Sequence, residues 1–123
     1  RSTHRLLDRF VPGPSVLEAL THLLVLGPRM GADIEEKTDR YERLLAEALD
    51  AASVAPPLDT PMGEAAADCL EMAESYLEDG RHFRDDDDLV NALASFSYGH
   101  AWLDAGARVG LFEVPTEGHL FTV

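Results

Sequence analysis

One stretch of this chain, residues 88–111, limits its possible folds more than any other. On a helical wheel, one face of this stretch is formed by Leu89, Leu93, Phe96, His100, Leu103 and Ala107. The opposite side carries Ala94, Tyr98, Ala101, Trp102 and Ala105. Few positions are left for charge, and a helix that is apolar nearly all round is buried on more than one side. The stretch therefore predicts the central helix of a bundle, with room for a partner subunit against its second side.

A first helix is predicted well before this stretch. Residues 33–53 show a stripe of apolar side chains at helical spacing. Asp33 provides a cap, and Glu36 follows at the spacing of a capping box. The proline-rich residues that follow, up to Pro61, break the chain.

The second helix begins at Thr60–Pro61, where a capping side chain precedes a first-turn proline. We extend it through Gly80 to about Arg84, because Phe83 returns to the apolar stripe. That extension accepts a glycine cost of about 1 kcal/mol inside a helix. The aspartates at 85–88 form the turn, and the last of them suit the start of the next helix. The pattern predicts an all-α protein, a three-helix bundle with long antiparallel second and third helices.

Charge and chain breakers divide the sequence into three parts. Residues 1–29 carry four arginines and two acidic residues, whereas residues 30–123 carry six basic and 21 acidic residues. The change suggests that residues 1–29 are an N-terminal extension, upstream of a true start at Met30, with a native amphipathic arm as the alternative. Residues 30–112 are predicted to form the helical bundle domain, and residues 113–123 a C-terminal tail without helical period.

The chain is strongly acidic, with a formal net charge of −13 and one lysine, Lys37. Repulsion from phosphates argues against binding to nucleic acid and to anionic membrane surfaces. No apolar run approaches the ~20 residues of a membrane helix, and the single cysteine, Cys69, excludes an internal disulfide. We therefore expect a cytoplasmic protein with the acid-rich surface of a halophilic organism, in which salt screens self-repulsion.

The polar residues of the central stretch allow two interpretations. His100 and Asp104 lie four positions apart, so they can meet on one helix face. The pair either satisfies itself inside the bundle or forms a working site in which the carboxylate orients the histidine. Asp79, on the preceding helix, is placed about three helical turns from His100, which argues against one shared site. Since two ligands do not make a metal site, we expect no catalytic residue, metal ion or cofactor.

Aromatic residues of the central stretch suggest a contact surface. Tyr98 and Trp102 lie on its less covered face, and aromatic side chains are enriched in protein interfaces. We therefore predict that these two are interface residues, and that the protein binds a protein partner or itself as a homo-oligomer.

Two segments, MAESYLEDGRHF and NALASFSYGHAWLDAGARVGLF, resemble the archaeal family known as domain of unknown function 357. In the first segment the matching positions are Tyr76, Asp79 and Phe83. In the second they are Tyr98, Leu103, Asp104 and Ala105. Gly99 and Ala101 depart from the family pattern by exchanges among small residues, which preserve close packing. The resemblance covers about residues 33–112 and implies a compact helical bundle but no particular activity.

The preferred interpretation is a small acidic helical protein that serves as a protein-interaction or assembly module. One alternative is a small metal-dependent enzyme that uses His100 and Asp104. A second alternative is an accessory domain of a nucleotide-handling enzyme.

Overall fold

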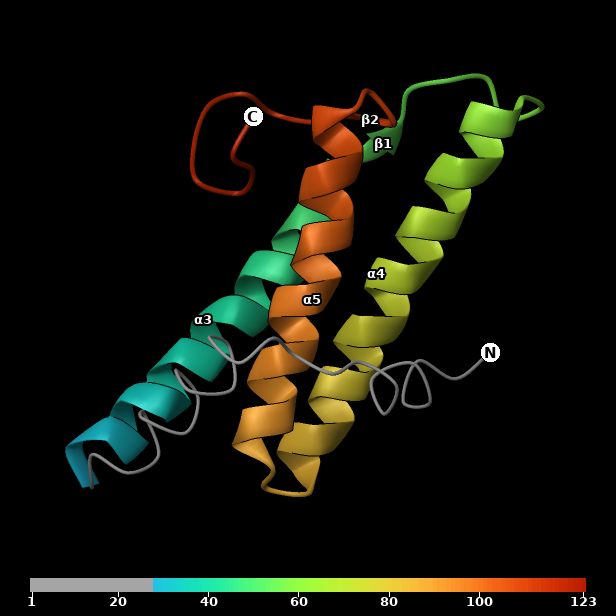
Figure 1. Cartoon of the computed structure of the whole chain (residues 1–123). Coiled ribbons are helices and arrows are strands. Elements are labelled where there is room, and N and C mark those ends of the chain that lie inside the picture. Colours follow the sequence, from blue (N-terminus) through green and yellow to red (C-terminus); the bar gives the residue numbers. More distant parts are fainter. Residues whose placement is uncertain (1–27) are drawn as a thin grey trace.

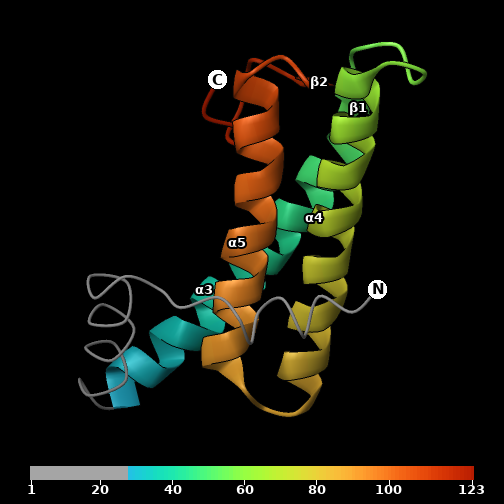
Figure 2. The ribbon, with the colours of Figure 1, turned by 45° about the vertical axis from the view of Figure 1, so that its right-hand side comes forward.

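A computed structural model describes the backbone of residues 28–123 and the side chains from Asp33 onward. Its helices are α3 (Pro28–Ala51), α4 (Pro61–Asp85) and α5 (Leu89–Arg108). Helices α4 and α5 form an antiparallel hairpin, and α3 crosses one face of that hairpin obliquely (Figures 1 and 2). The predicted all-α, three-helix bundle is thus confirmed. The predicted N-terminal extension falls almost entirely on residues 1–27, which lie outside the described part of the chain.

Helix α3 begins earlier than the sequence suggested. It starts at Pro28, so the prediction that Asp33 caps it is wrong, and Asp33 lies inside the helix. A proline at the first helical position has a helix-compatible φ and lacks an N–H that would in any case have no partner there. Pro28 is therefore the first residue of the helix and does not act as a chain breaker before it.

Helix α4 begins as predicted. Thr60 is its N-cap, and its hydroxyl accepts a hydrogen bond from the backbone N–H of Gly63 at 3.1 Å. The same hydroxyl donates to the carbonyl of Pro57 at 2.5 Å, which fixes the direction in which the chain enters the helix.

The turn between α4 and α5 is made by the aspartate run. Asp87 has φ 61, in the left-handed region that aspartate tolerates better than most residues. Asp88 caps α5 by accepting a hydrogen bond from the backbone N–H of Asn91 at 3.2 Å. The prediction that the last aspartates of the run start the third helix is therefore confirmed.

Glycines let the helices approach closely at the centre of the bundle. A Cβ placed on Gly80 of α4 would lie 2.3 Å from the ring of Phe96, which is fully buried on α5. A Cβ on Gly99 would lie 2.9 Å from both Leu45 of α3 and Tyr76 of α4. Gly99 thus sits where all three helices meet, which gives a packing reason for a residue smaller than alanine there.

A short sheet closes the end of the bundle opposite the turn. Strand β1 (Ser53–Val54) pairs antiparallel with β2 (Phe112–Glu113), and Val54 lies opposite Phe112. The ring of Phe112 packs on Gly106 of α5, where a Cβ would come within 2.4 Å of it. This sheet could not be predicted from the sequence, because two-residue strands are too short to show a period of two.

A charged cluster ties α3 to the turn end of α4. The carboxylate of Glu42 accepts hydrogen bonds from Arg81 and Arg84, each at 2.7 Å. Arg84 also pairs with Asp39, one turn before Glu42 on α3.

None of the helices in the described part of the chain is both long and apolar enough to cross a membrane.

Candidate functional site

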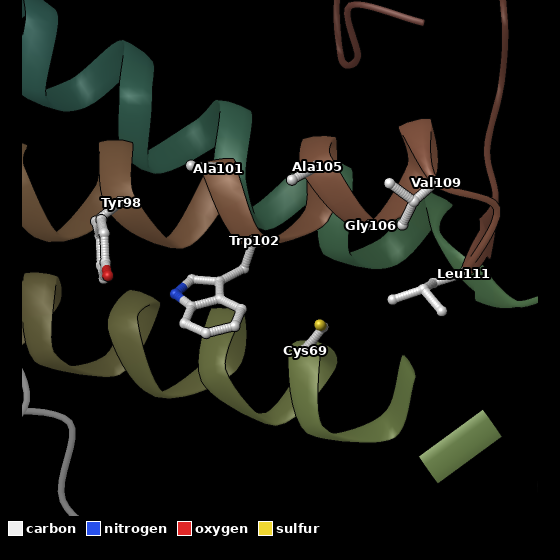
Figure 3. Close-up of a pocket in the computed structure, with 8 residues that line it drawn as sticks. All are labelled: Cys69, Tyr98, Ala101, Trp102, Ala105, Gly106, Val109 and Leu111. Carbon is white, nitrogen blue, oxygen red and sulfur yellow. The ribbon is translucent and has the colours of Figure 1, made fainter. Parts of the chain in front are cut away.

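An apolar groove lies along α5, at the side where α4 diverges from it (Figure 3). Its volume is about 360 Å³. Its lining residues are Cys69, Tyr98, Ala101, Trp102, Ala105, Gly106, Val109 and Leu111. Tyr98 and Trp102 reach from α5 toward α4, and Cys69 faces them from α4 (Figure 3). The two residues predicted as interface candidates therefore share one wall of this groove.

The wall of the groove is held by a chain of aromatic contacts. The ring centroids of Tyr76 and Tyr98 lie 4.8 Å apart, and those of Tyr98 and Trp102 lie 6.2 Å apart, both pairs edge to face. The indole Nε1 of Trp102 is buried and has no hydrogen-bond partner within the described part of the chain. Figure 3 shows that this nitrogen points toward the ring of Tyr98. The edge-to-face contact with Tyr98 thus packs the indole of Trp102 into the wall of the groove.

Ionisation is suppressed for two α4 side chains, Cys69 in the wall of the groove and Tyr76 beside it. Burial raises the pKa of Tyr76 to about 12, with help from Tyr98 and from the charge of Asp79. Burial, with the nearby charge of Asp68, also raises the pKa of the Cys69 thiol. Both groups are consequently neutral at physiological pH, and Cys69 lacks the thiolate character of a nucleophile. These two side chains thus add no charge to the apolar lining of the groove.

Two exposed apolar side chains lie at the end of the bundle where α4 begins and α5 ends, and one of them, Val109, lines the groove. Val109 is 67% exposed and Met62 is 50% exposed.

Residues 89–103 of α5 contain no aspartate, glutamate, lysine or arginine. A chain with a net charge of −13 therefore presents one helix edge that is free of formal charge over several turns.

A second site lies on another side of α5, where side chains four residues apart hold the segment Leu120–Thr122. Asp104 accepts hydrogen bonds from the backbone N–H and the hydroxyl of Thr122, at 2.9 and 2.5 Å. Arg108 donates to the carbonyl and the hydroxyl oxygen of Thr122, at 2.8 and 3.2 Å. Nε2 of His100 lies 2.6 Å from the carbonyl oxygen of Leu120. Because a carbonyl only accepts, this ring nitrogen carries the hydrogen.

Phe121 is buried between these polar contacts. Its exposed fraction is 8%, and its ring lies 6.0 Å from that of His100 at an interplanar angle of 30°. His100 and Asp104 thus share one face of α5, as predicted. Within the described part of the chain, their hydrogen bonds go to the segment Leu120–Thr122 and not to each other.

The carboxylate of Asp104 should make this anchoring sensitive to acid. Burial raises the pKa of Asp104, but the hydrogen bonds from Thr122 and the charges of His100 and Arg108 outweigh it, so the pKa lies below that of an ordinary aspartate. The stabilisation is then complete above the ordinary pKa of about 3.9 and is lost as the pH falls through the lower folded-state pKa. We expect the NMR protection factor of the Thr122 amide to be constant from about pH 7 to 5 and to fall below about pH 4. The same profile in Asp104→Asn would contradict this assignment.

Asp79 has a different setting from the other two predicted polar residues. It lies on α4, partly buried, one turn after Tyr76, and its charge acts on the phenol of that residue. His100 and Asp104 are instead engaged with the segment Leu120–Thr122. Among residues 33–123, no group of three or more histidine, cysteine, aspartate or glutamate side chains is arranged to hold a metal ion.

Arg108, Phe121 and Thr122, which complete the second site, were not predicted from the sequence. Arg108 follows His100 and Asp104 at the same spacing of four, which places all three along one helix face. That spacing could have indicated that Arg108 belongs to the site. Phe121 and Thr122 could not be predicted, because an irregular segment has no periodicity that shows which of its side chains pack against a helix.

Comparison with known proteins identifies one family. The model of the family described as "Protein of unknown function (DUF357)" matches residues 40–112. This range includes both walls of the apolar groove and the side chains that hold Leu120–Thr122, but not that segment itself. No curated protein and no solved structure matches the chain.

Proposed function

We propose that this chain, which belongs to the DUF357 family, is an assembly module that pairs with a second copy of itself through the α4–α5 groove. One observation carries the proposal. The wall of the groove is apolar and partly open, and it borders the uncharged span of α5. An open apolar surface rimmed by polar residues is typical of an interaction site.

The distribution of charge favours a second copy approaching along α5. Helix α4 exposes a series of acidic side chains: Glu64, Asp68, Glu71, Glu74 and Glu78. A contact centred on α4 would bring the like charges of two copies together. A contact centred on residues 89–103 of α5 avoids this, because that span contributes no charge from either copy. Ala101 within this span and Ala105 just beyond it are small and exposed, so two α5 helices can approach closely about a two-fold axis.

A charged side chain at this contact should separate the copies. Multi-angle light scattering in about 1 M potassium chloride, where the screening length is ~3 Å, should give a dimer for the native chain. Ala101→Glu should raise the dissociation constant of the dimer at least about a hundredfold, because two buried like charges oppose association. Ala101 is exposed in one copy, so the helical circular dichroism of this variant should be unchanged.

Ala67→Glu provides the matched control. Ala67 is also an exposed alanine, but it lies on α4 outside the groove, so the dimer should persist in that variant. Equal weakening by both variants would mean that net charge alone controls association. A native chain that stays monomeric at millimolar concentration would refute the proposal.

No observation favours the enzyme alternative over assembly. His100 and Asp104 are occupied by contacts with Leu120 and Thr122, and the groove contributes no ionised side chain.

A further inference from the structure

Three polar side chains on one face of α5 converge on three consecutive residues of the same chain. We propose that this face is a binding site for a peptide segment of the type Leu-Phe-Thr, and that residues 120–122 fill it in cis. The site lies apart from the α4–α5 groove, and the inference is independent of the proposed assembly. The ligand class is a partner segment in which an aromatic residue precedes a threonine or serine.

The contacts are those of peptide recognition rather than of general tail packing. His100 binds the main-chain carbonyl of Leu120, and Asp104 and Arg108 bind the main-chain N–H and carbonyl of Thr122. Main-chain hydrogen bonds supply affinity for any extended segment, and pockets for side chains supply specificity. Here Phe121 occupies the pocket, at 8% exposure and as part of the hydrophobic core.

The hydroxyl of Thr122 adds a second element of specificity. It donates to Asp104 at 2.5 Å and accepts from Arg108 at 3.2 Å, so both of its roles are used. Valine has the same shape but would leave a carboxylate and a guanidinium without these bonds. Hydrogen bonds to charged groups are stronger than those between neutral groups, so the hydroxyl favours threonine over valine.

The anchored segment is attached to the bundle through an exposed connection. Residues 115–119 are exposed, and burial resumes only at Leu120. The side chain of His119 borders a cavity of about 300 Å³ against α3, with Arg40, Tyr41 and Leu44 on its wall. The segment is therefore a discrete anchor on a tether, with open space beside it for a longer ligand.

The residues matched by the family model include the side chains of the site but not the segment that fills it. His100, Asp104 and Arg108 lie inside the matched residues 40–112, whereas Leu120–Thr122 lies beyond them. A short flexible tether gives its end an effective concentration in the millimolar range. A free peptide should therefore enter the site only when the tethered segment is weakened, and a tight-binding partner would have to displace it.

The test uses the full chain with Phe121→Ala and Thr122→Ala, which leaves the tether but removes the anchor. A fluorescein-labelled peptide with the sequence of residues 117–123, EGHLFTV, should bind this variant at least tenfold more tightly than the native chain in fluorescence anisotropy. Adding Asp104→Asn should weaken that binding about tenfold or more, as expected for a charge-assisted hydrogen bond. The peptide EGHLFVV, which lacks the hydroxyl, should also bind more weakly.

Two results would overturn the inference. One is the absence of binding to a double variant that keeps its helical circular dichroism. The other is equal binding of EGHLFTV and a scrambled peptide, which would indicate an unspecific apolar surface. Should the double variant unfold, Thr122→Val alone takes its place, because it keeps Phe121 and removes only the hydroxyl. That chain should bind the labelled peptide more tightly than the native chain does, and equal affinities would count against the proposal.

Discussion

Phe96→Ala should lower the free energy of unfolding by about 3–5 kcal/mol, the usual cost of removing a buried aromatic side chain. Phe96 has no exposed surface, and its ring lies against the backbone of Gly80 where α4 and α5 meet. The loss can be measured by urea unfolding followed by circular dichroism at constant high salt. A change below about 1 kcal/mol would mean that the helices do not pack at this point.

The same contact predicts that the effect of Gly80→Ala on the free energy of unfolding changes sign when Phe96 is replaced by alanine. In the native chain the added methyl group would overlap the ring of Phe96, which should cost about 1–3 kcal/mol. In the Phe96→Ala background the ring is absent, so Gly80→Ala should stabilise α4 by up to about 1 kcal/mol through helix propensity. A double-mutant cycle measures this reversal directly. Equal effects in both backgrounds would show that the two residues are not in contact.

Gly63→Ala should be destabilising by about 2–4 kcal/mol, because overpacking and the loss of a helix cap act together. A Cβ at Gly63 would lie 2.0 Å from the carbonyl oxygen of Pro57. That oxygen accepts hydrogen bonds from both the backbone N–H and the hydroxyl of Thr60, so it cannot move without breaking the cap. The start of α4 would have to unwind.

Ala67→Gly is the matched control for this variant. Ala67 is exposed on the same helix, one turn further on, and the exchange should cost about 1 kcal/mol through helix propensity alone. If propensity also governed position 63, Gly63→Ala would stabilise the protein by a similar amount. A stabilised Gly63→Ala variant in urea unfolding would therefore show that the close contact with Pro57 is absent.

The sequence by itself determined the helices of the bundle, because the signals that define them act over short distances. The apolar stripe repeats every three or four residues, and the caps Thr60 and Asp88 act on N–H groups three positions away. Such signals can be recognised without knowledge of the fold. The start of α3 at Pro28 was not predicted, because a first-turn proline and a chain-breaking proline cannot be distinguished from the sequence alone.

The sequence also identified a few of the residues at the two candidate sites. Tyr98 and Trp102 line the groove, and His100 and Asp104 share a face of α5. Periodicity places residues on a helix, but it does not say what each face meets. The groove exists because α4 diverges from α5 beyond Trp102, which is a property of two helices together (Figure 3).

Only the tertiary structure decided the partners. Glu42 meets Arg81 and Arg84 from positions 39 and 42 residues away, and Asp104 meets Thr122 from 18 residues away. Gly80, which counted as a cost on the helical wheel, proves to be the space into which Phe96 packs. Hydrogen bonds and close contacts depend on positions within a few tenths of an ångström, and those positions are set when all three helices pack at once. A local pattern of side chains does not contain that information.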